Sequence, residues 1–499
     1  MGNDYSDVLI VGAGLSGIGA AARLQKHCPS KSFAIIESRS QLGGTWDLFK
    51  YPGIRSDSDM HTLGYDFKPW THAKAIADGA DILSYLHETV ADYNLADSIH
   101  YGQKLIAADW NSTECEWTVT LETAEGQTTR RCHVLYMCSG YYKYDTGYRP
   151  AFTDEAAFEG PIVHPQHWPD DMDYDGKKIV IIGSGATAVT LMPNLAKRAA
   201  HVTMLQRSPT YMGVMSSTDR IANGLRAVLP DGLAYKITRW KNLTMGRWIY
   251  NWMRTSPESG KRFLFKKIKK ALGDDYPISP NFTPAYNPWD QRLCLVPDND
   301  MFNAMNAGKA DIVTDTIDRF TKTGIALSSG EHLDADIIIT ATGLNLQILG
   351  GASFRVDGAD VDFGQTHSYE AMMFSSVPNM ASVFGYVNAS WTLRADLVSS
   401  YMCRLINHMD DIGMRQFMPV APEGMPMKPW FDFFQAGYIK RSADQLPKQG
   451  DSDPWLNSQN YTRDRKHLPT KPLEDGAMVF SNPANQSNRQ TDICVDAAE

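Results

Sequence analysis

Two short apolar runs, each followed by closely spaced glycines, stand out in the hydrophobic pattern of the chain. The first run is DVLIV at residues 7–11, and the second is IVII at residues 179–182. Unbroken apolar runs of this length are typical of parallel strands that are buried on both faces. Helix-forming segments follow at residues 18–27 and 188–199. The pattern therefore predicts two strand–turn–helix units of an α/β fold.

The turn of the first unit carries the GxGxxG pattern of dinucleotide-binding folds. Gly12 suits the tight turn, Gly14 lets a pyrophosphate approach the backbone, and Gly17 lets helix and strand pack closely. A following strand, SFAIIE, ends at Glu37, whose carboxylate can accept hydrogen bonds from a ribose diol and repels a 2′-phosphate. We therefore predict that FAD or NAD binds here. The alternative is a tight turn with an incidental acidic residue.

The turn of the second unit has the same form, with alanine in the third glycine position, which the fingerprint permits. The strand that follows, HVTMLQRS, ends in Arg207 and Ser208 rather than in an acidic residue. Arginine binds a 2′-phosphate through paired charge-assisted hydrogen bonds, so this site is predicted to prefer NADPH to NADH. The alternative is a solvated arginine at a strand end. The cofactor contacts expected from the turn are Gly183, Ser184, Gly185, Thr187 and Ala188.

The bulk composition excludes several classes of protein. A formal net charge of −9 argues against general nucleic-acid binding, and no apolar run reaches the roughly 18–20 residues that span a bilayer. The seven cysteines include no CxxC pair, which argues against a disulfide framework and a metal site. With an N-terminus that lacks the features of a signal peptide, these observations predict a cytoplasmic protein with reduced thiols and no bound metal.

Two longer motifs narrow the class of flavoprotein. Residues 158–169 read FEGPIVHPQHWP and match FxGxxxHxxxW(P/D), and residues 44–57 read GTWDLFKYPGIRSD and match GxWxxxx(F/Y)PGxxxD. On these motifs the chain resembles the type I (class B) Baeyer–Villiger flavin monooxygenases. Within that family, the stretches FKYPGIRSDSDMHTLGYDF and YNPWDQRLCLVPDNDMF resemble the branch that contains the mycobacterial ethionamide-activating monooxygenase.

The resemblance implies a reaction and its cofactors. NADPH reduces FAD, reduced flavin and O2 form a C4a-peroxyflavin, and one oxygen atom is inserted into a ketone to give an ester or lactone. Oxidation of sulfides is expected as well. One alternative is a heteroatom (S/N)-oxygenating flavin-containing monooxygenase, a group that usually has Tyr or Phe where this chain has Trp168. The other is a non-enzymatic NADPH-sensing flavoprotein, against which the intact catalytic pattern argues.

The resemblance also assigns catalytic residues. The essential arginine of the family corresponds to Arg292 in PWDQRLC, and a permanent cation suits an anionic oxygen adduct. Asp57, which closes the second motif, corresponds to the acid that orients this arginine, and Asp59 is a nearby alternative. Many family members have lysine before the arginine; Gln291 stands there in this chain, which puts more of the phosphate binding on Arg207. Contacts to FAD are implied for Gly44, Thr45, Trp46 and Asp57.

Other family positions have two interpretations each. The first fingerprint is expected to be a hinge that couples the nicotinamide and flavin domains, or else a rigid linker with a packed tryptophan. Asn388 and Trp391 fall where the family has residues near flavin and substrate, although Trp391 also suits a core position. The fingerprint residues are Phe158, Gly160, His164 and Trp168.

The predicted architecture is an α/β fold with two Rossmann-like domains, for FAD and for NADPH, and a helical insertion. We expect residues 1–145 and 345–499 to form the FAD-binding domain, with a mobile polar tail after about residue 469. Residues 150–215 and 291–344 are expected to form the NADPH-binding domain.

The helical insertion is expected at residues 216–290. Its run KRFLFKKIKK, residues 261–270, is basic and amphipathic. This run either belongs to a solvated helix of an insertion that covers the substrate or allows weak association with a membrane surface.

Overall fold

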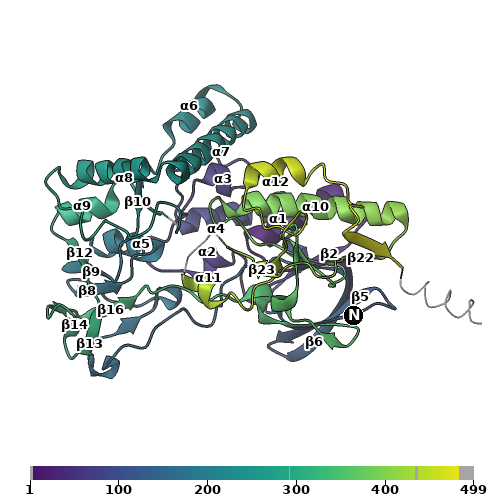
Figure 1. The fold of residues 1–499 in the computed structure, drawn as a ribbon, viewed down its shortest axis with the longest axis horizontal. Coiled ribbons are helices and arrows are strands. Elements are labelled where there is room, and N and C mark those ends of the chain that lie inside the picture. Colours follow the sequence, from purple (N-terminus) through teal and green to yellow (C-terminus); the bar gives the residue numbers. More distant parts are fainter. Residues whose placement is uncertain (1–3, 292, 433–436, 483–499) are drawn as a thin grey trace, which may run out of the picture.

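The computed structural model describes residues 4–291, 293–432 and 437–482 of the chain. Figure 1 shows two lobes, each built around its own sheet. Helices α6 (Arg220–Val228) and α7 (Asp231–Thr255) project from the upper side in that view. The predicted α/β class with two Rossmann-like units is confirmed.

The larger sheet contains the first predicted unit. Strand β1 (Tyr5–Val11) lies between β6 (Gly126–Met137) and β2 (Phe33–Ile36), and the three run parallel and end at the same edge. The strand order is β18-β17-β4-β5-β6-β1-β2-β3, with β21 also paired to β6. The remaining strands are β3 (Ile99–His100), β4 (Lys104–Asn111), β5 (Glu116–Thr123), β17 (Ser353–Val356), β18 (Ala359–Asp360) and β21 (Met380–Ser382).

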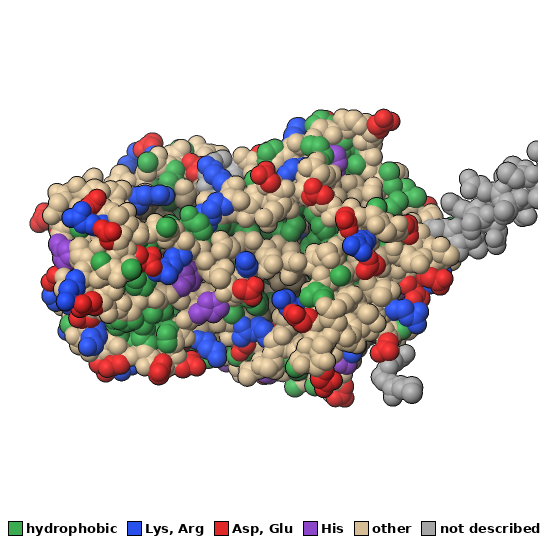
Figure 2. Space-filling view, turned by 90° about the horizontal axis from the view of Figure 1, so that it is seen from below, with side chains coloured by type: hydrophobic (Ala, Val, Ile, Leu, Met, Phe, Trp, Pro, Cys, Tyr) green, Lys and Arg blue, Asp and Glu red, His purple; other side chains and the backbone are tan. Residues whose placement is uncertain are grey.

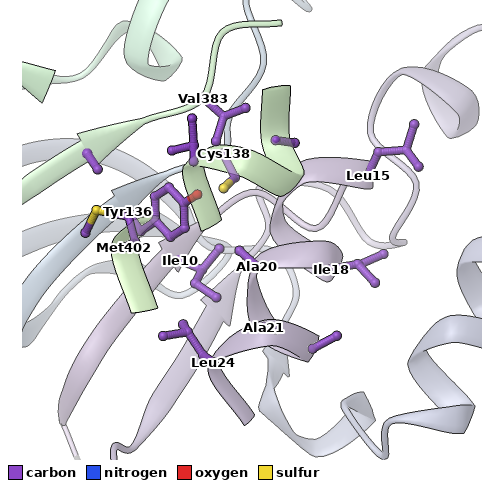
Figure 3. Packing of buried hydrophobic residues seen from close by; sticks show 14 of the residues in the cluster. Ile10, Leu15, Ile18, Ala20, Ala21, Leu24, Tyr136, Cys138, Val383 and Met402 are labelled. Carbon is purple, nitrogen blue, oxygen red and sulfur yellow. The ribbon is translucent and has the colours of Figure 1, made fainter. Parts of the chain in front are cut away.

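Helix α1 (Leu15–His27) packs on β1 and β2 and, on another side, on α10 (Trp391–Ile412). Figure 3 shows this packing, where Ile10 of β1, Ala20 of α1 and Met402 of α10 belong to one apolar cluster. Full burial of each large apolar side chain stabilises a fold by about 1.5–3 kcal/mol. This cluster therefore holds the turn between β1 and α1 firmly in place.

The smaller lobe contains the second predicted unit. Its strands are all parallel, in the order β12-β9-β8-β16-β7. Alternate residues of β8 face opposite layers: Ile179 packs toward helices, and Val180 packs toward a small antiparallel sheet. This two-sided burial explains the unbroken apolar run. The strands are β7 (Ile162–Val163), β8 (Lys178–Ile182), β9 (His201–Gln206), β12 (Ala310–Thr314) and β16 (Ile337–Thr340), and the helices are α5 (Ala186–Leu195), α8 (Pro257–Leu272) and α9 (Asp300–Asn306).

Helix α7 of the insertion is anchored on the larger lobe. The Tyr235 hydroxyl donates to the carbonyl oxygen of Tyr65 at 2.8 Å. The buried Arg239 guanidinium donates to the carbonyl oxygens of His61 and Gly64, both at 2.8 Å. These acceptors lie in and just after α3 (Met60–Leu63), so the insertion is packed against the loop that begins near residue 57.

Part of the polar stretch after Pro469, expected to be mobile, has defined structure at residues 470–482. Strand β25 (Met478–Ser481) pairs with β22 (Gln416–Pro419). Lys471 is only 7% exposed, and its ammonium group lies 3.1 Å from Glu370 and 2.6 Å from Asp475. Ion pairs to buried carboxylates therefore fix a segment that composition alone marked as solvated.

Shorter elements complete the described part of the chain. Its cysteines, Cys28, Cys115, Cys132, Cys138, Cys294 and Cys403, are buried free thiols, and Cys494 lies outside the described residues. The short helices are α2 (Thr45–Leu48), α4 (Gly79–Asp92), α11 (Gly437–Arg441) and α12 (Tyr461–His467). The short strands are β10 (Met212–Met215), β11 (Cys294–Pro297), β13 (Ile317–Thr321), β14 (Gly324–Leu327), β15 (His332–Asp334), β19 (Ser368–Tyr369), β20 (Met373–Phe374), β23 (Lys428–Pro429) and β24 (Lys448–Gln449).

Candidate functional site

A cavity of about 870 Å³ lies where the two lobes meet. Its wall combines the edge at which β1, β2 and β6 end with the first turns of α5. Both glycine-containing units therefore contribute to one cavity, and its volume suits a large organic ligand. Of the residues singled out from the sequence, the cavity is lined by Gly12, Gly14, Glu37, Gly44, Thr45, Trp46, Asp57, Thr187 and Trp391.

The first glycine turn has no room for side chains at two of its positions. Gly12 has a φ of +107°, and a Cβ there would lie 2.7 Å from the carbonyl oxygen of Cys138. A Cβ on Gly17 would lie 1.9 Å from the carbonyl oxygen of Gly12. Gly12 and Gly14 face the cavity, whereas Gly17 packs α1 on β1. The backbone at this turn is thus exposed to whatever the cavity holds.

Glu37, at the end of β2, is buried and held in one orientation. Its Oε2 accepts a hydrogen bond from the backbone N–H of Ala13 at 2.8 Å, and its Oε1 accepts one from the N–H of Arg39 at 3.0 Å. The carboxylate therefore closes the glycine turn and still lines the cavity. This geometry presents acceptor oxygens beside the turn, as a ribose diol requires.

The second glycine turn repeats this design with alanine as its third member. A Cβ on Gly183, whose φ is +139°, would lie 2.3 Å from the carbonyl oxygen of Ala341. Ala188 is fully buried against the strand. Gly185 is exposed with open space around its Cα, and the Ser184 hydroxyl donates to the carbonyl oxygen of Ser208 at 3.0 Å. The open side of the turn faces solvent.

Arg207 and Ser208 follow β9 directly and are exposed. They lie outside the wall of the cavity, as do Gly183, Ser184 and Gly185. Within the described parts of the chain, the Arg207 guanidinium has no hydrogen-bond or ion-pair partner. A fixed positive charge beside the Ser184 turn is thus available to an anionic group from solution.

The loop of residues 44–57 bridges the lobes. Gly44 lies close to the first glycine turn, and its Cα is 3.7 Å from the position a Cβ on Gly14 would take. Farther along, Gly53 has a φ of +79°, and a Cβ there would lie 1.9 Å from the Asn194 amide nitrogen of α5. Tyr51 lies next to the Thr187 side chain of α5, and burial raises the pKa of Tyr51 to about 12. The loop therefore contacts both units at once.

The two candidate acids at the end of this loop differ in their surroundings. Asp57 is exposed and lines the cavity. Asp59 caps α3, accepting from the Thr62 N–H at 3.1 Å, and also accepts from the Asn242 amide at 2.8 Å. Asp59 thus has a structural function at the base of the insertion. Arg292 lies outside the described residues.

The fingerprint residues 158–168 have packing functions. Phe158 is buried against Phe320, and a Cβ on Gly160 would lie 2.3 Å from the carbonyl oxygen of Asp336. The His164 Nδ1 accepts from the Gln166 N–H, and its Nε2–H donates to the carbonyl oxygen of Gly343 at 3.1 Å.

Trp168, the last fingerprint residue, packs edge-on against Tyr174, with ring centroids 6.5 Å apart. Burial lowers the pKa of His164, which keeps the ring neutral at pH 7. His167 of this segment lines the cavity, whereas Phe158, Gly160, His164 and Trp168 do not and instead tie the linker to the smaller lobe.

Of the two residues suggested near the C-terminal part, Trp391 reaches the cavity and Asn388 does not. The Trp391 indole N–H donates to the Ser16 hydroxyl at 2.8 Å, and the ring stacks on Tyr141 with centroids 5.1 Å apart. The Asn388 amide donates instead to the carbonyl oxygen of Gln459. Trp391 is therefore a wall residue that also supports α1.

Several wall residues were not singled out from the sequence. Tyr141 and Tyr142, whose hydroxyls are 2.8 Å apart, follow β6 at the edge where β1 and β2 also end. The available signal was their place just after an apolar strand, where ligands bind in open parallel sheets. The remaining wall residues of this kind include Gln103, Lys104, Tyr144, Asp145, Gln347, Gly350 and Gly351.

The residues present fit two dinucleotides. The first turn offers a bare backbone at Gly12 and Gly14 with the Glu37 carboxylate beside it, which suits an adenosine diphosphate with a free ribose diol. The second turn offers an open Gly185 with the Arg207 guanidinium beside it, which suits a 2′-phosphate. The donor sets therefore agree with FAD in the first unit and NADPH in the second.

Comparison with known proteins identifies the family. The model of the flavin-binding monooxygenase-like family matches residues 63–348, and that of an NAD(P)-binding Rossmann-like domain matches residues 10–78. The chain belongs to the flavin-binding monooxygenase-like family. It is 51% identical over 479 residues to the FAD-containing monooxygenase EthA of Mycobacterium tuberculosis (strain ATCC 25618 / H37Rv), covering 96% of this chain and 98% of that protein. The predicted mycobacterial branch is thus confirmed.

A second relative of this family member is the probable FAD-binding monooxygenase AlmA of Acinetobacter baylyi, 47% identical over 490 residues and 98% of both chains. Among solved structures, oxidized steroid monooxygenase bound to NADP has a TM-score of 0.77 at 20% identity, covering 96% of this chain and 99% of that one. Open cyclohexanone monooxygenase has a TM-score of 0.75 at 18% identity, with coverage of 96% and 99%. The predicted flavin monooxygenase, with FAD and NADPH as the cofactors of its family, is confirmed.

Two further features concern the described residues of this flavin-binding monooxygenase. None of its described helices is long and apolar enough to cross a membrane. The same residues contain no group of three or more His, Cys, Asp or Glu side chains arranged to hold a metal ion.

Proposed function

We propose that this flavin-binding monooxygenase is a Baeyer–Villiger enzyme that converts ketones to esters or lactones and also oxidises sulfides. The observation that supports this most directly is the shared cavity, because Gly12 of the first unit, Thr187 of the second and Asp57 all line it. When bound, FAD supplies the activation of O2 and NADPH supplies the hydride. Small-molecule ketones or sulfides are the proposed substrates.

The proposed cofactor contacts follow the two turns. At the first turn, backbone N–H groups and the Glu37 carboxylate hold and orient the adenosine diphosphate part of FAD. At the second turn, Arg207 holds the 2′-phosphate of NADPH. The FAD set is Gly12, Gly14, Gly17, Glu37, Gly44, Thr45, Trp46 and Asp57, and the NADPH set is Gly183, Ser184, Gly185, Thr187, Ala188, Arg207 and Ser208.

Arg292 is the proposed cation beside the reacting oxygen, and Asp57 is the acid that orients it. Arginine keeps its proton at any working pH, so it stabilises an anion without neutralising it. Two observations support Asp57 over Asp59: Asp57 lines the cavity, and Asp59 is already used to cap α3. Strand β11, which begins at Cys294 two residues after Arg292, brings Leu295 into the same wall.

The fingerprint is proposed to act as a hinge. His164 supports this, because it joins the linker to Gly343 at the end of the smaller sheet. We propose residues 1–145 and 345–499 as the FAD-binding domain, 150–215 and 291–344 as the NADPH-binding domain, and 216–290 as the insertion. The strands that form each of the two main sheets are consistent with this division. Trp391 is the proposed pocket residue, with Asn388 positioning the segment before it.

The test is a product assay with linear, cyclic and aryl ketones and with aryl sulfides, together with NADPH consumption. We expect esters or lactones from ketones and sulfoxides from sulfides. The Arg292→Ala variant should still reduce its flavin but should form no ester, whereas the exposed-site control Arg319→Ala should match the unchanged enzyme. Normal ester formation by Arg292→Ala would contradict the assignment.

The same assay separates the alternatives. Sulfoxides or N-oxides without any ester would identify a heteroatom-oxygenating monooxygenase. Flavin reduction with no oxygenated product from any substrate would favour the NADPH-sensing flavoprotein. A cytoplasmic location and weak membrane association are also proposed, and fractionation of cells that produce the protein tests both.

A further inference from the structure

The apolar side chains exposed on this molecule are concentrated on the helical insertion. Among the described residues, nine of the thirteen large hydrophobic side chains that are exposed lie between residues 215 and 263. Trp248 is 64% exposed and Trp240 62% exposed. Contiguous apolar surface on a folded chain marks an interaction site more often than isolated residues do. The nine are Met215, Ile221, Val228, Leu233, Ile237, Trp240, Met245, Trp248 and Phe263.

Four of the five exposed apolar residues of α7 form one stripe, and the fifth is Met245. Leu233, Ile237, Trp240 and Trp248 follow one another at intervals of four, three and eight residues, which places them on one side of a helix. The opposite side of α7, with Ala234, Tyr235, Thr238, Arg239 and Met253, is buried. The stripe is therefore not the side that α7 uses to pack on the larger lobe.

The stripe continues onto α8 through aromatic contacts. Trp248 stacks on Trp252 with ring centroids 5.9 Å apart, and Trp252 packs edge-on against Phe263 of α8 at 5.6 Å. The Lys267 ammonium lies 5.6 Å from the centroid of the Phe263 ring. The apolar surface thus ends directly at the basic residues of α8.

The apolar side of the basic helix α8 is mostly packed inside the protein. Leu264 and Ile268 of α8 are buried in the smaller lobe, and Arg262, Lys266 and Lys267 point to solvent. The amphipathic run at 261–270 is thus a packed surface helix. It supplies charge and the exposed Phe263, while α6 and α7 supply seven of the nine exposed apolar side chains.

The charge of the insertion is opposite to that of the whole chain. Residues 216–272 contain thirteen Lys and Arg but only three Asp and Glu, whereas the chain carries −9. Figure 2, which views the molecule from the side opposite α6 and α7, shows acidic and basic side chains intermixed. A cationic surface with exposed tryptophans matches the interface of an anionic bilayer, where indole rings lie at headgroup level and Lys and Arg contact phosphates.

We infer that the α6–α8 surface docks this enzyme on membranes rich in anionic lipid. This surface, defined by the nine apolar residues above with Arg262, Lys266 and Lys267, shares no described residue with the cavity wall. The inference therefore does not rest on the proposed chemistry. It identifies α7, not the amphipathic run of α8, as the part that enters the bilayer surface.

The test is flotation of the flavin-loaded enzyme with vesicles of phosphatidylcholine alone or mixed with phosphatidylglycerol. We expect binding to the mixed vesicles, weaker binding to phosphatidylcholine, and release by salt because screening weakens charge attraction. The double variants Trp240→Gln/Trp248→Gln and Lys266→Glu/Lys267→Glu should each lower the partition coefficient by about tenfold or more. Controls are Met427→Gln and Lys322→Glu, an exposed apolar and an exposed basic residue outside the surface.

Each result has a defined meaning, because retained flavin absorbance shows that a variant is folded. Failure of the unchanged enzyme to float with mixed vesicles at low salt would overturn the inference. Equal flotation of both double variants and the unchanged enzyme would also overturn it. A third outcome would also contradict the inference. If the unchanged enzyme binds no vesicles and is a dimer by light scattering, and Trp240→Gln/Trp248→Gln is a monomer, the surface joins two copies of the chain.

Discussion

The side chains of Tyr51 and Thr187 lie next to each other at the junction of the two lobes. Tyr51 lies in the loop of residues 44–57, beside the first glycine turn. Thr187 lies in the first turn of α5, which follows the second glycine turn. Both line the cavity. One side-chain contact thus joins the two nucleotide-binding units at the place where their ligands would meet.

Removal of either partner should weaken this junction. Tyr51→Phe and Thr187→Val should each lower the free energy of unfolding by about 1 kcal/mol, because each removes one polar group from this buried side-chain contact. The double variant should lose less than the sum, since both changes remove the same contact. Denaturant unfolding measures all four proteins, with Tyr101→Phe as an exposed control. Strict additivity would show that the contact contributes nothing.

Glu37→Gln should reduce flavin retention. The amide cannot accept from both the Ala13 and Arg39 N–H groups as the carboxylate does, and it offers a ribose diol one acceptor fewer. We expect the dissociation constant for FAD to rise by about tenfold. The ratio of flavin to protein absorbance after dialysis measures this, with Glu125→Gln in the exposed turn between β5 and β6 as the control. Full flavin content in Glu37→Gln would remove Glu37 from the proposed site.

Arg207→Ala should change the choice between nicotinamide cofactors. Loss of a charge-assisted contact to the 2′-phosphate should raise KM for NADPH by about ten- to a hundredfold. KM for NADH should stay within about twofold, since NADH lacks that phosphate. Steady-state kinetics with both cofactors, and with Arg319→Ala as control, make the comparison. An equal rise for NADPH and NADH would assign Arg207 a structural function only.

Asp57 and Asp59 should have separable effects. Asp57→Asn should keep flavin and its reduction by NADPH but lower product formation by about tenfold or more, with the oxygen lost as H2O2. Asp59→Ala should lower the free energy of unfolding by about 1 kcal/mol, because it removes the cap of α3, and should keep product formation per folded enzyme. Product yield per NADPH consumed distinguishes them. The reverse pattern would make Asp59 the orienting acid.

Asp396 should make stability depend on pH. Burial and the nearby Asp66 raise its pKa to about 6, although Arg23 and Arg239 each lie 3.5 Å away. An unfolded aspartate titrates near pH 4, so the stabilisation is complete below about pH 4 and is lost as the pH rises through 6. Asp396→Asn should remove at most about 3 kcal/mol of this dependence.

Urea unfolding between about pH 4 and pH 7 tests this prediction for Asp396. The variant should show a flatter dependence of the unfolding free energy on pH than the unchanged enzyme. Asp410→Asn, which alters an exposed ion pair with Lys31, is the control and should keep the slope. Parallel slopes for Asp396→Asn and the unchanged enzyme would contradict the prediction.

The sequence by itself determined the features that depend on local geometry. Gly12 and Gly183 sit in turns with φ of +107° and +139°, which favour glycine, so this requirement for glycine is set within one short segment. Glu37 and Arg207 each follow a strand whose apolar pattern fixes where it ends. These features specified both nucleotide units and, with the longer motifs, the family.

Only the tertiary structure decided which residues meet from distant parts of the chain. The sequence motif favoured Asp57 but left Asp59 open as an alternative, and the packing of α3 against the insertion gives Asp57 to the cavity and Asp59 to a helix cap. Likewise, the amphipathic run of α8 suggested that its own apolar side could contact a membrane. Packing buried that side and left apolar residues of α7 exposed instead. Such choices depend on which surfaces face each other, and a pattern of hydrophobic positions specifies that a side is apolar without specifying what covers it.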